Sequence, residues 1–255
     1  MNKGIIIIPT YNEAENIVEL IENIASLPER FDILIVDDNS PDGTVDKVQQ
    51  YIRSRAHSSE IDDLKIIIES REVKKGLGTA YIHGFKKALE EGYEYIFEMD
   101  ADFSHNPFDL ILLYNACADE GFDLAIGSRY ISGVNVVNWP MGRVLLSYFA
   151  SSYVRIITGM PVRDATAGFK CYKRKVLETI DFDKIRFIGY AFQIEMKFTT
   201  WKHGFKMKEV PIVFTDRKRG QSKMSVKIIK EAIFGVISMK FNSFFKKYPK
   251  ISQTE

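Results

Sequence analysis

Two aspartates separated by one alanine, Asp100 and Asp102, are the residues whose type and spacing most clearly suggest chemistry. They follow the apolar segment 95–99, which is typical of a buried strand, and Asn106-Pro107 then ends the extended stretch. The pair should therefore lie at the carboxyl edge of a sheet, where open α/β folds bind ligands. Carboxylate oxygens suit a hard divalent cation that shares its ligands with a phosphate. An ordinary acidic turn has the same pattern, so the pair needs support from other motifs.

That support comes from two further strand ends. The apolar segment 33–36 is followed by Asp-Asp-Asn-Ser at 37–40, and the segment 5–8 is followed by Pro-Thr-Tyr-Asn-Glu at 9–13. We expect all three strand ends at the same edge of the sheet. A nucleotide could lie across the first two, with its phosphates reaching a cation at the third.

The familiar nucleotide-binding loops are missing. Gly76-x-Gly78 is followed by Tyr81 where the dinucleotide fingerprint requires its third glycine, and the chain has no GxxxxGK[ST] sequence. We also find no nucleophile elbow with a Ser/His/Asp or Cys/His set. The sequence therefore indicates neither dinucleotide redox chemistry nor P-loop hydrolysis.

The elements that must position these residues alternate along the chain, which predicts a mostly parallel α/β sheet covered by helices. The predicted strands are 5–8, 33–36, 64–68, 95–99, 124–126, 169–172 and 207–214. The predicted helices are 13–25, 42–53, 78–89, 107–118 and 191–202, with a further long segment at 143–158. The regular alternation ends after Arg129.

The composition is that of an ordinary soluble protein. The chain has 255 residues, of which 45% are hydrophobic and 27% are charged, and this fits one large α/β domain. Its two cysteines, Cys117 and Cys171, lack metal-type spacing and favour a reducing, cytoplasmic setting. The apolar run near the N-terminus is broken by Pro9, so we interpret it as a strand and not as a signal peptide.

The charge is unevenly distributed. Residues 217–255 contain ten Lys or Arg and two acidic residues, a net charge of +8, so residues 1–216 carry −7. A basic end suggests a polyanionic partner: phospholipid, nucleic acid or a phosphorylated substrate. No apolar run approaches the roughly 20 residues of a membrane span. We predict a catalytic domain over 1–224 and, over 225–255, an amphipathic basic helix and tail that lies on a membrane surface. The alternative is a helix packed on the protein's own core.

Taken in order, PTYNEAENI, VDDNSPDGT, KKGLGTAYIHGF, MDADFSHNP and IGSRY resemble a family 2 glycosyltransferase with the GT-A fold. NWPMGRVLLS (138–147), DATAGF (164–169) and RKRGQSK (217–223) further resemble the dolichol-phosphate mannose synthases of that family. The match runs from about Ile5 to Lys223.

The resemblance implies a role for each matching position. The positions that hold the nucleotide are Pro9, Tyr11, Glu13, Val36 and Asp38. Those that hold the metal and the donor diphosphate are Asp100, Ala101 and Asp102. Those that bind the acceptor phosphate are Arg129, Arg143 and Ser147, and those of a loop that closes over the donor are Arg219 and Lys223.

Some assignments stay open at this point. Ser104 stands where some members carry a glutamine as a further metal ligand, so we expect its hydroxyl or a water to serve. Asp164 could orient a sugar hydroxyl or cap a turn, and His105 could be a ligand or a solvent-facing loop residue. Each arginine could instead form a salt bridge with a nearby acid.

The implied reaction is transfer of mannose from GDP-mannose to a polyprenyl monophosphate, with inversion and with Mg²⁺ or Mn²⁺. A phosphate monoester is largely dianionic at neutral pH, so no general base is needed. The implied enzyme is cytoplasmic and peripheral on a membrane, with a separate anchoring subunit as a possible partner and no nucleic acid. One alternative is a related transferase with another nucleotide sugar, such as UDP-glucose, or with a hydroxyl acceptor and Asp164 as base. The other is a catalytically silent nucleotide-binding subunit.

Overall fold

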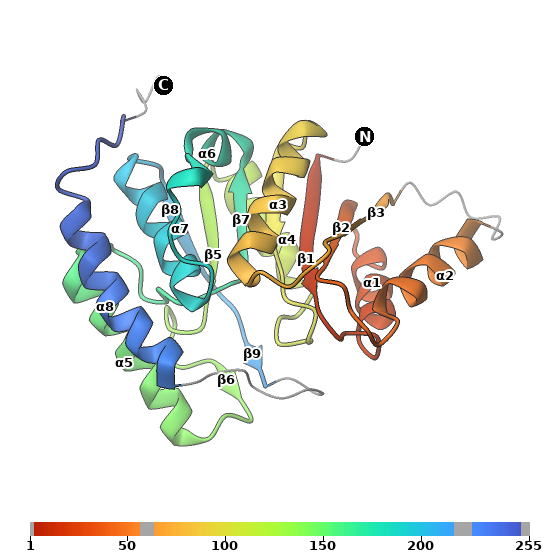
Figure 1. Ribbon diagram of the computed structural model, residues 1–255, viewed down its shortest axis with the longest axis horizontal. Coiled ribbons are helices and arrows are strands. Elements are labelled where there is room, and N and C mark those ends of the chain that lie inside the picture. The colour runs from red at the N-terminus through yellow and green to blue at the C-terminus, as the bar shows by residue number, and fades with distance from the viewer. Residues whose placement is uncertain (1–2, 57–63, 217–225, 251–255) are drawn as a thin grey trace.

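The computed structural model describes residues 3–56, 64–216 and 226–250, with side chains from Ile233 onward in the last range (Figure 1). Its centre is a seven-stranded sheet with the strand order β3-β2-β1-β4-β7-β5-β8. The strands are β1 Gly4–Thr10, β2 Phe31–Asp37, β3 Ile66–Ser70, β4 Tyr95–Glu98, β5 Leu124–Ser128, β7 Lys170–Lys173 and β8 Met207–Pro211. All neighbours pair in parallel except β7, which is antiparallel to β4 and β5.

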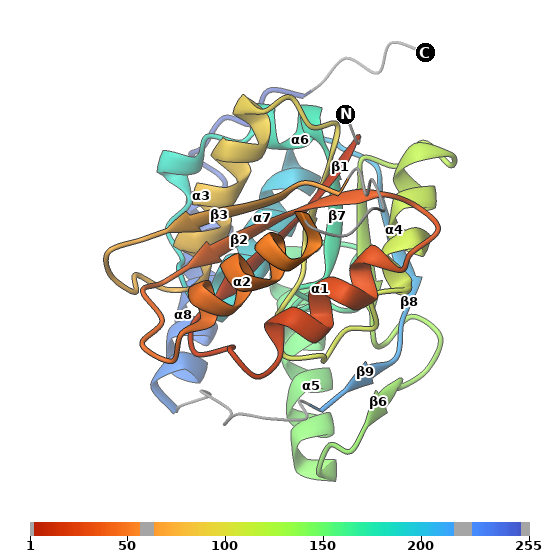
Figure 2. The ribbon, with the colours of Figure 1, turned by 90° about the vertical axis from the view of Figure 1, so that its right-hand side faces the viewer.

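Helices cover both faces of the sheet, as its apolar central strands require. One face carries α1 (Ile17–Ala25), α2 (Thr44–Ala56) and α4 (Asp109–Ala118), which share a core with the isoleucines at even positions of β1 (Figure 2). The other face carries α3, α5, α6, α7 and α8. Their bounds are α3 Leu77–Glu90, α5 Met141–Thr158, α6 Arg174–Thr179, α7 Tyr190–Lys202 and α8 Val226–Asn242, and a 3₁₀ turn, η1, spans Phe182–Lys184.

Two short strands lie beyond the carboxyl edge of the sheet. β6 (Val136–Val137) and β9 (Phe214–Thr215) pair in parallel, and α5 begins directly after β6 (Figure 1). The α8 helix lies beside α5: the Tyr153 hydroxyl donates to the Ile233 carbonyl at 3.0 Å, and Lys240 Nζ donates to the Thr158 carbonyl at 2.9 Å. This pair of helices borders the same edge where the predicted site residues lie.

The α/β fold predicted from the alternation is confirmed, with three differences. The first helix starts at Ile17, not at 13, because residues 14–16 form a turn in which the Asn16 and Ile17 amides donate to the Glu13 carbonyl. The strand predicted over 207–214 is divided into β8, which pairs with β5, and β9, which pairs with β6 in a separate small sheet. The predictions also missed β6, α6 and the antiparallel direction of β7. Among the described residues, no helix combines the length and apolarity of a membrane span.

Candidate active site

The loops after β1, β2 and β4 meet at the carboxyl edge of the sheet, and each turns through a left-handed residue. These residues are Asn12 (φ 61°), Asn39 (φ 57°) and Phe103 (φ 59°). Asparagine tolerates this conformation, whereas phenylalanine rarely adopts it. A bulky left-handed residue between Asp102 and Ser104 marks a backbone held in a strained shape, as is common at functional sites.

Asp37 holds the first two loops together. Its carboxylate accepts from the Thr10 hydroxyl at 2.7 Å, from the Ser40 amide at 2.8 Å and from the Ser40 hydroxyl at 2.6 Å. Asp42 adds a bond from the Ala14 amide at 3.0 Å. Asp37, the last residue of β2, therefore has a structural role, and of the two adjacent aspartates Asp38 is the nucleotide candidate.

Asp38 is buried in an ion pair that the sequence did not predict. Arg71 donates to Asp38 Oδ1 from Nε at 2.6 Å, with Nη2 at 2.5 Å from the same oxygen. Its Nη1 donates to the Thr79 hydroxyl at 2.9 Å. A carboxylate and a guanidinium side by side present both acceptors and donors, which suits the edge of a nucleobase.

The other four nucleotide candidates lie near this pair, at the ends of β1 and β2. Pro9, Tyr11 and Glu13 are half-buried, and Lys74 Nζ lies 3.6 Å from the centre of the Tyr11 ring. The side chain of Val36 is fully buried, so only its backbone is able to contact a ligand. The structure thus brings the predicted nucleotide residues to one corner of the sheet.

Asp100 and Asp102 follow β4. The Tyr81 hydroxyl donates to Asp100 Oδ1 at 3.2 Å, and the Ser104 amide donates to Asp102 Oδ1 at 3.1 Å. Asp102 is only 9% exposed, and Ala101 between the two is buried. Burial and the nearby Asp100 carboxylate raise the pKa of Tyr81 far above its usual value, with a smaller contribution from Asp102. The Asp100 carboxylate therefore accepts from a protonated, buried hydroxyl.

A fully buried polar network supports this loop from behind. Glu98, the last residue of β4, forms an ion pair with Lys170 at 2.9 Å. It also accepts from the Tyr172 hydroxyl at 2.9 Å and from Gln193 Nε2 at 2.7 Å. Burial lowers the pKa of Lys170, and the Glu98 carboxylate opposes that shift. Satisfied networks of this kind fix the geometry of the backbone that they hold.

Arg129 follows β5 and is held by Asp164. Its Nε donates to Asp164 Oδ2 at 2.7 Å, its Nη2 to Oδ1 at 2.6 Å, and its backbone amide to Oδ2 at 3.0 Å. Burial alone would raise the pKa of Asp164, but the positive charge and hydrogen bonds of Arg129 lower it. The Asp164 carboxylate is fully buried, so in this structure it neither reaches a sugar nor acts as a base.

Arg143, in the first turn of α5, lies on the same aromatic side chain as Arg129. Its Cζ lies 4.0 Å from the Trp139 ring centre, and Arg129 Cζ lies 5.5 Å from it. Arg143 Nη1 donates to Asp216 Oδ1 at 2.8 Å. Each arginine thus has the acidic partner considered as an alternative, yet the two guanidinium groups still share one indole.

Ser147 and Trp139 complete this part of the site. Burial raises the pKa of Tyr130, and both the Arg129 charge and the Ser147 hydroxyl lower it, so Ser147 lies close to Tyr130. Trp139 Nε1 is buried and has no hydrogen-bond partner among the described residues. The predicted acceptor residues are therefore close together, beside an indole donor that lacks an acceptor.

His105 connects the two halves of the site. It is 3% exposed, stacks on Phe169 with ring centres 4.7 Å apart, and meets the edge of Phe214 at 5.3 Å. Phe214 in turn lies 5.4 Å from Arg129 Cζ. Burial lowers the pKa of His105 to about 4, against the opposing effect of Asp102. The solvent-facing interpretation of His105 was wrong.

The remaining predicted residues are the possible further metal ligands, His105 and Ser104, and the two basic residues Arg219 and Lys223. No set of three or more His, Cys, Asp or Glu within the described ranges could hold a metal ion, so His105 does not complete such a set with the aspartates. Ser104 is 2% exposed, and its role as a ligand stays a prediction. Arg219 and Lys223 lie outside the described residues.

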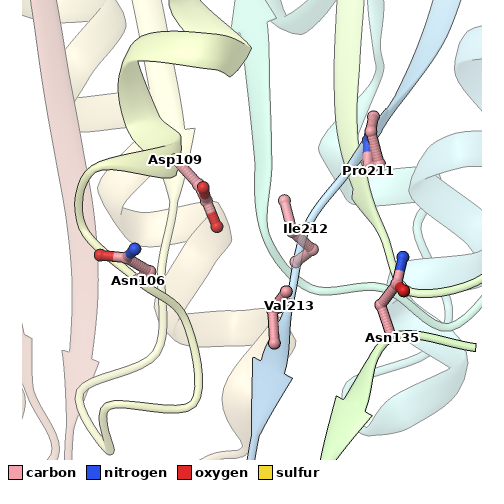
Figure 3. A pocket seen from close by; sticks show the side chains of 6 residues that line it. All are labelled: Asn106, Asp109, Asn135, Pro211, Ile212 and Val213. Carbon is pink, nitrogen blue, oxygen red and sulfur yellow. The ribbon is translucent and has the colours of Figure 1, made fainter.

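A small cavity of about 210 Å³ lies beside the loop that follows Asp102 (Figure 3). It is lined by Asn106, Asp109, Asn135, Pro211, Ile212 and Val213. Ligand pockets usually measure about 300–1,000 Å³, so this cavity is too small for a nucleotide sugar. Burial raises the pKa of Asp109, on its wall, to about 6.

The chain is similar to several known proteins. The model of "Glycosyl transferase family 2" matches residues 5–181. The chain is 43% identical over 234 residues to the polyprenol monophosphomannose synthase of Mycolicibacterium smegmatis, covering 92% of this chain and 85% of that protein. It is 42% identical over 230 residues to the undecaprenyl-phosphate mannosyltransferase of Micrococcus luteus, covering 90% of each.

Solved structures with low sequence identity share the fold. The mannosyltransferase PcManGT from Pyrobaculum calidifontis, solved with GDP-Man and Mn²⁺, is 18% identical. It superposes with a TM-score of 0.61 over 97% of this chain and 66% of that one. A mycobacterial protein superposes with a TM-score of 0.63 at 14% identity, over 99% of this chain and 76% of that one. These likenesses concern the fold alone, and they confirm the GT-A fold expected from the motifs.

Proposed function

The chain belongs to glycosyl transferase family 2, and we propose that it transfers mannose from GDP-mannose to a polyprenyl monophosphate, giving polyprenyl-phosphate mannose. The names of the two relatives support the sugar and the acceptor class. The GDP-Man bound to the structural neighbour supports the donor. Transfer by single displacement with inversion is part of the proposal.

The observation that carries the proposal is the shared stacking of Arg129 and Arg143 on Trp139. A planar guanidinium matches the oxygens of a phosphate, and arginine is the preferred residue for that task. The indole N–H that lacks an acceptor adds a neutral donor at the same place. His105 and Phe214 connect these arginines to the Asp100–Asp102 loop, so an acceptor phosphate held here faces the donor side of the site.

The chemistry needs little from the protein beyond position and charge. A phosphate oxygen of the acceptor attacks the anomeric carbon, a new C–O bond forms, and the bond from that carbon to the diphosphate breaks. The acceptor is largely dianionic at neutral pH, so no proton has to be removed. Arg129 and Arg143 orient the nucleophile and offset the repulsion between two anions. Arg219 and Lys223, outside the described residues, are proposed to contact the departing diphosphate.

The donor set of Asp100 and Asp102 fits a divalent cation. Mg²⁺ typically takes one or two carboxylates and completes its shell with substrate phosphates and water, so a third protein ligand is not required. When bound, Mg²⁺ or Mn²⁺ would neutralise charge on the leaving diphosphate. Because Ser104 is buried, we favour water over its hydroxyl as a further ligand.

The alternatives have less support. A hydroxyl acceptor would need a base, and Asp164, the candidate, is buried against Arg129 with a lowered pKa. A silent subunit would have no need of two carboxylates oriented by Tyr81 and by the Ser104 amide. A different nucleotide sugar is the alternative that only an assay distinguishes.

We also propose that the surface formed by α5, α8 and residues 243–245 contacts a membrane. The sequence left two alternatives for α8, contact with a membrane and packing on the protein's own core, and each describes part of the helix. Val236 and Met239 are buried in the core, whereas Phe234 is 70% exposed. The exposed apolar side chains of this surface are Met141, Leu145, Leu146, Tyr148, Phe149, Ile156, Ile233, Phe234, Ile237, Phe241, Phe244 and Phe245. Large exposed apolar patches on a monomer mark an interaction site. Because Arg143 and Ser147 lie on α5, the acceptor could enter from lipid directly, and we propose no separate anchoring subunit.

A panel assay tests the proposal. Purified protein is incubated with Mn²⁺ and GDP-mannose, GDP-glucose or UDP-glucose, and with a short polyprenyl phosphate or the matching alcohol. We expect product only from GDP-mannose with the phosphate, and none with a chelator. Product from the alcohol, or a preference for UDP-glucose, would replace the proposal with one of the alternatives.

A further inference from the structure

The motif KKGLGTAYIHGF has no part in the reaction outlined above, although it matches the family pattern. It forms the start of α3, and two of its glycines press that helix against its neighbours. A Cβ at Gly78 would lie 2.7 Å from the Phe192 ring, and one at Gly84 would lie 2.5 Å from Ile7. Side chains at these positions would push α3 away from α7 and β1. The glycines therefore set the depth at which α3 sits.

That depth fixes the position of Tyr81, which lies on α3 between the two glycines. Its ring is fully buried and parallel to Phe192, with an interplanar angle of 1° and ring centres 6.2 Å apart. Phe85, one turn later, stacks on it from within α3 at 6.2 Å. With its ring packed on both sides, Tyr81 cannot turn its hydroxyl elsewhere without disturbing the core.

The hydroxyl of Tyr81 donates to Asp100 Oδ1 at 3.2 Å. An ionised carboxylate only accepts, so the tyrosine must be the donor. The other oxygen, Oδ2, lies on the side of Gly168, 3.9 Å from where a Cβ of that residue would be. The two oxygens of Asp100 are thus held in different surroundings, one against a fixed donor and one beside a glycine.

We propose that Tyr81 is a positioning residue that orients Asp100 for a divalent cation and the diphosphate bound with it. Carboxylates that bind metals are themselves usually hydrogen-bonded, and losing such a partner typically lowers metal affinity by about 10–100-fold. The inference rests on the proposed function only for the presence of a cation with a nucleoside diphosphate. It does not depend on which sugar or acceptor is used.

The test compares Tyr81→Phe with Tyr93→Phe. Both variants remove one hydroxyl from a buried tyrosine that donates to an aspartate, because Tyr93 donates to Asp32 Oδ2 at 2.6 Å. Asp32 lies near the start of β2, away from the carboxyl edge. Tyr93→Phe is therefore a matched control for the loss of a buried hydrogen bond.

Mn²⁺ binding is measured by electron paramagnetic resonance and by calorimetry, with GDP or UDP, whichever the wild-type protein binds. We expect Tyr81→Phe to bind Mn²⁺ about 10–100-fold more weakly and Tyr93→Phe to bind it like the wild type. Thermal unfolding of both variants checks that the fold is retained.

The inference is overturned if Tyr81→Phe keeps wild-type Mn²⁺ affinity, if Tyr93→Phe loses as much, or if the wild-type protein binds no Mn²⁺. Failure of the proposed function appears differently. If Tyr81→Phe alone loses Mn²⁺ affinity but the wild type transfers no mannose to polyprenyl phosphate, the positioning role stands and the assigned reaction falls.

Discussion

The carboxylate of Asp164 holds the guanidinium group of Arg129 through hydrogen bonds of 2.7 Å and 2.6 Å, in an ion pair that is almost completely buried. The Glu209 carboxylate accepts from the Asp164 amide at 2.8 Å and so fixes the backbone of the pair. Arg129 is therefore an oriented group at the proposed acceptor site, and the residue that orients it is itself fully buried.

We predict that Asp164→Asn destabilises the protein and weakens acceptor use. Removing one charge of a buried pair leaves the other uncompensated, which costs about 3 kcal/mol or more. Denaturant unfolding measures that loss, and steady-state kinetics should give a raised KM for the acceptor with an unchanged KM for the donor. Asp181→Asn, which removes an exposed partner of Lys184, is the control and should change stability little. Equal unfolding curves for Asp164→Asn and wild type would contradict the assigned role.

Asp216 should compete with the acceptor for Arg143. Its carboxylate lies 2.8 Å from Arg143 Nη1, with 27% and 29% of the two side chains exposed, so an incoming phosphate meets a like charge. We predict that Asp216→Asn strengthens binding of a short polyprenyl phosphate several-fold, whereas Arg143→Ala weakens it without changing nucleotide affinity. Calorimetric titration with the short polyprenyl phosphate and with the nucleotide shows whether each variant binds the acceptor more or less tightly. Weaker acceptor binding by Asp216→Asn would mean that the carboxylate orients the arginine and does not compete.

The stability of the protein should depend on pH through Asp109, on the wall of the small cavity. Burial raises its pKa from the usual 3.8 to about 6, so the folded state binds this proton more tightly than the unfolded chain does. The resulting contribution to stability is complete below pH about 4 and is lost as the pH rises through about 6. Asp109→Asn should abolish this loss of stability with rising pH. Thermal unfolding from pH 4 to 7 tests it, and parallel curves for variant and wild type would show that Asp109 titrates normally.

Membrane contact should require the aromatic end of the surface formed by α5, α8 and residues 243–245. Replacing Phe241, Phe244 and Phe245 by serine should reduce binding to anionic liposomes, because these side chains are 61–77% exposed. Nearby lysines would add roughly 1 kcal/mol each near an anionic surface, so binding should weaken with salt. Leu112→Ser, an exposed apolar change on α4, is the control in co-sedimentation. Undiminished or salt-independent binding of the triple variant would rule out this surface.

The sequence was most informative where local pattern decides structure. The apolar segments with polar ends located β1, β2 and β4 and placed Asp38, Asp100 and Asp102 at one edge. Partners far apart in sequence were not predictable: Arg129 and Asp164 are 35 residues apart, and Glu98 and Gln193 are 95 apart. Such pairs depend on how β7 and α7 dock, which no local periodicity encodes.

His105 shows the same limit at a single residue. The sequence left it open as a ligand or a solvent-facing loop residue, and stacking on Phe169 buries it. Glu98 carried a signal that could have been used, because a charged residue at the end of an apolar strand needs a buried partner. The tyrosine of the KKGLGTAYIHGF motif carried none, since its contact with Asp100 depends on the depth of α3.

The most direct test of the proposed reaction measures transfer of radiolabelled mannose from GDP-mannose to a short polyprenyl phosphate. It compares the wild-type protein with the Asp102→Ala variant. Loss of leaving-group stabilisation worth several kcal/mol should reduce transfer by the variant at least a hundredfold. Its circular dichroism should remain that of the wild type. We predict lipid-linked mannose from wild type with Mn²⁺ or Mg²⁺ and almost none from the variant or with chelator. Transfer by Asp102→Ala at the wild-type rate with chelator present would show that the reaction does not depend on a cation held by Asp102.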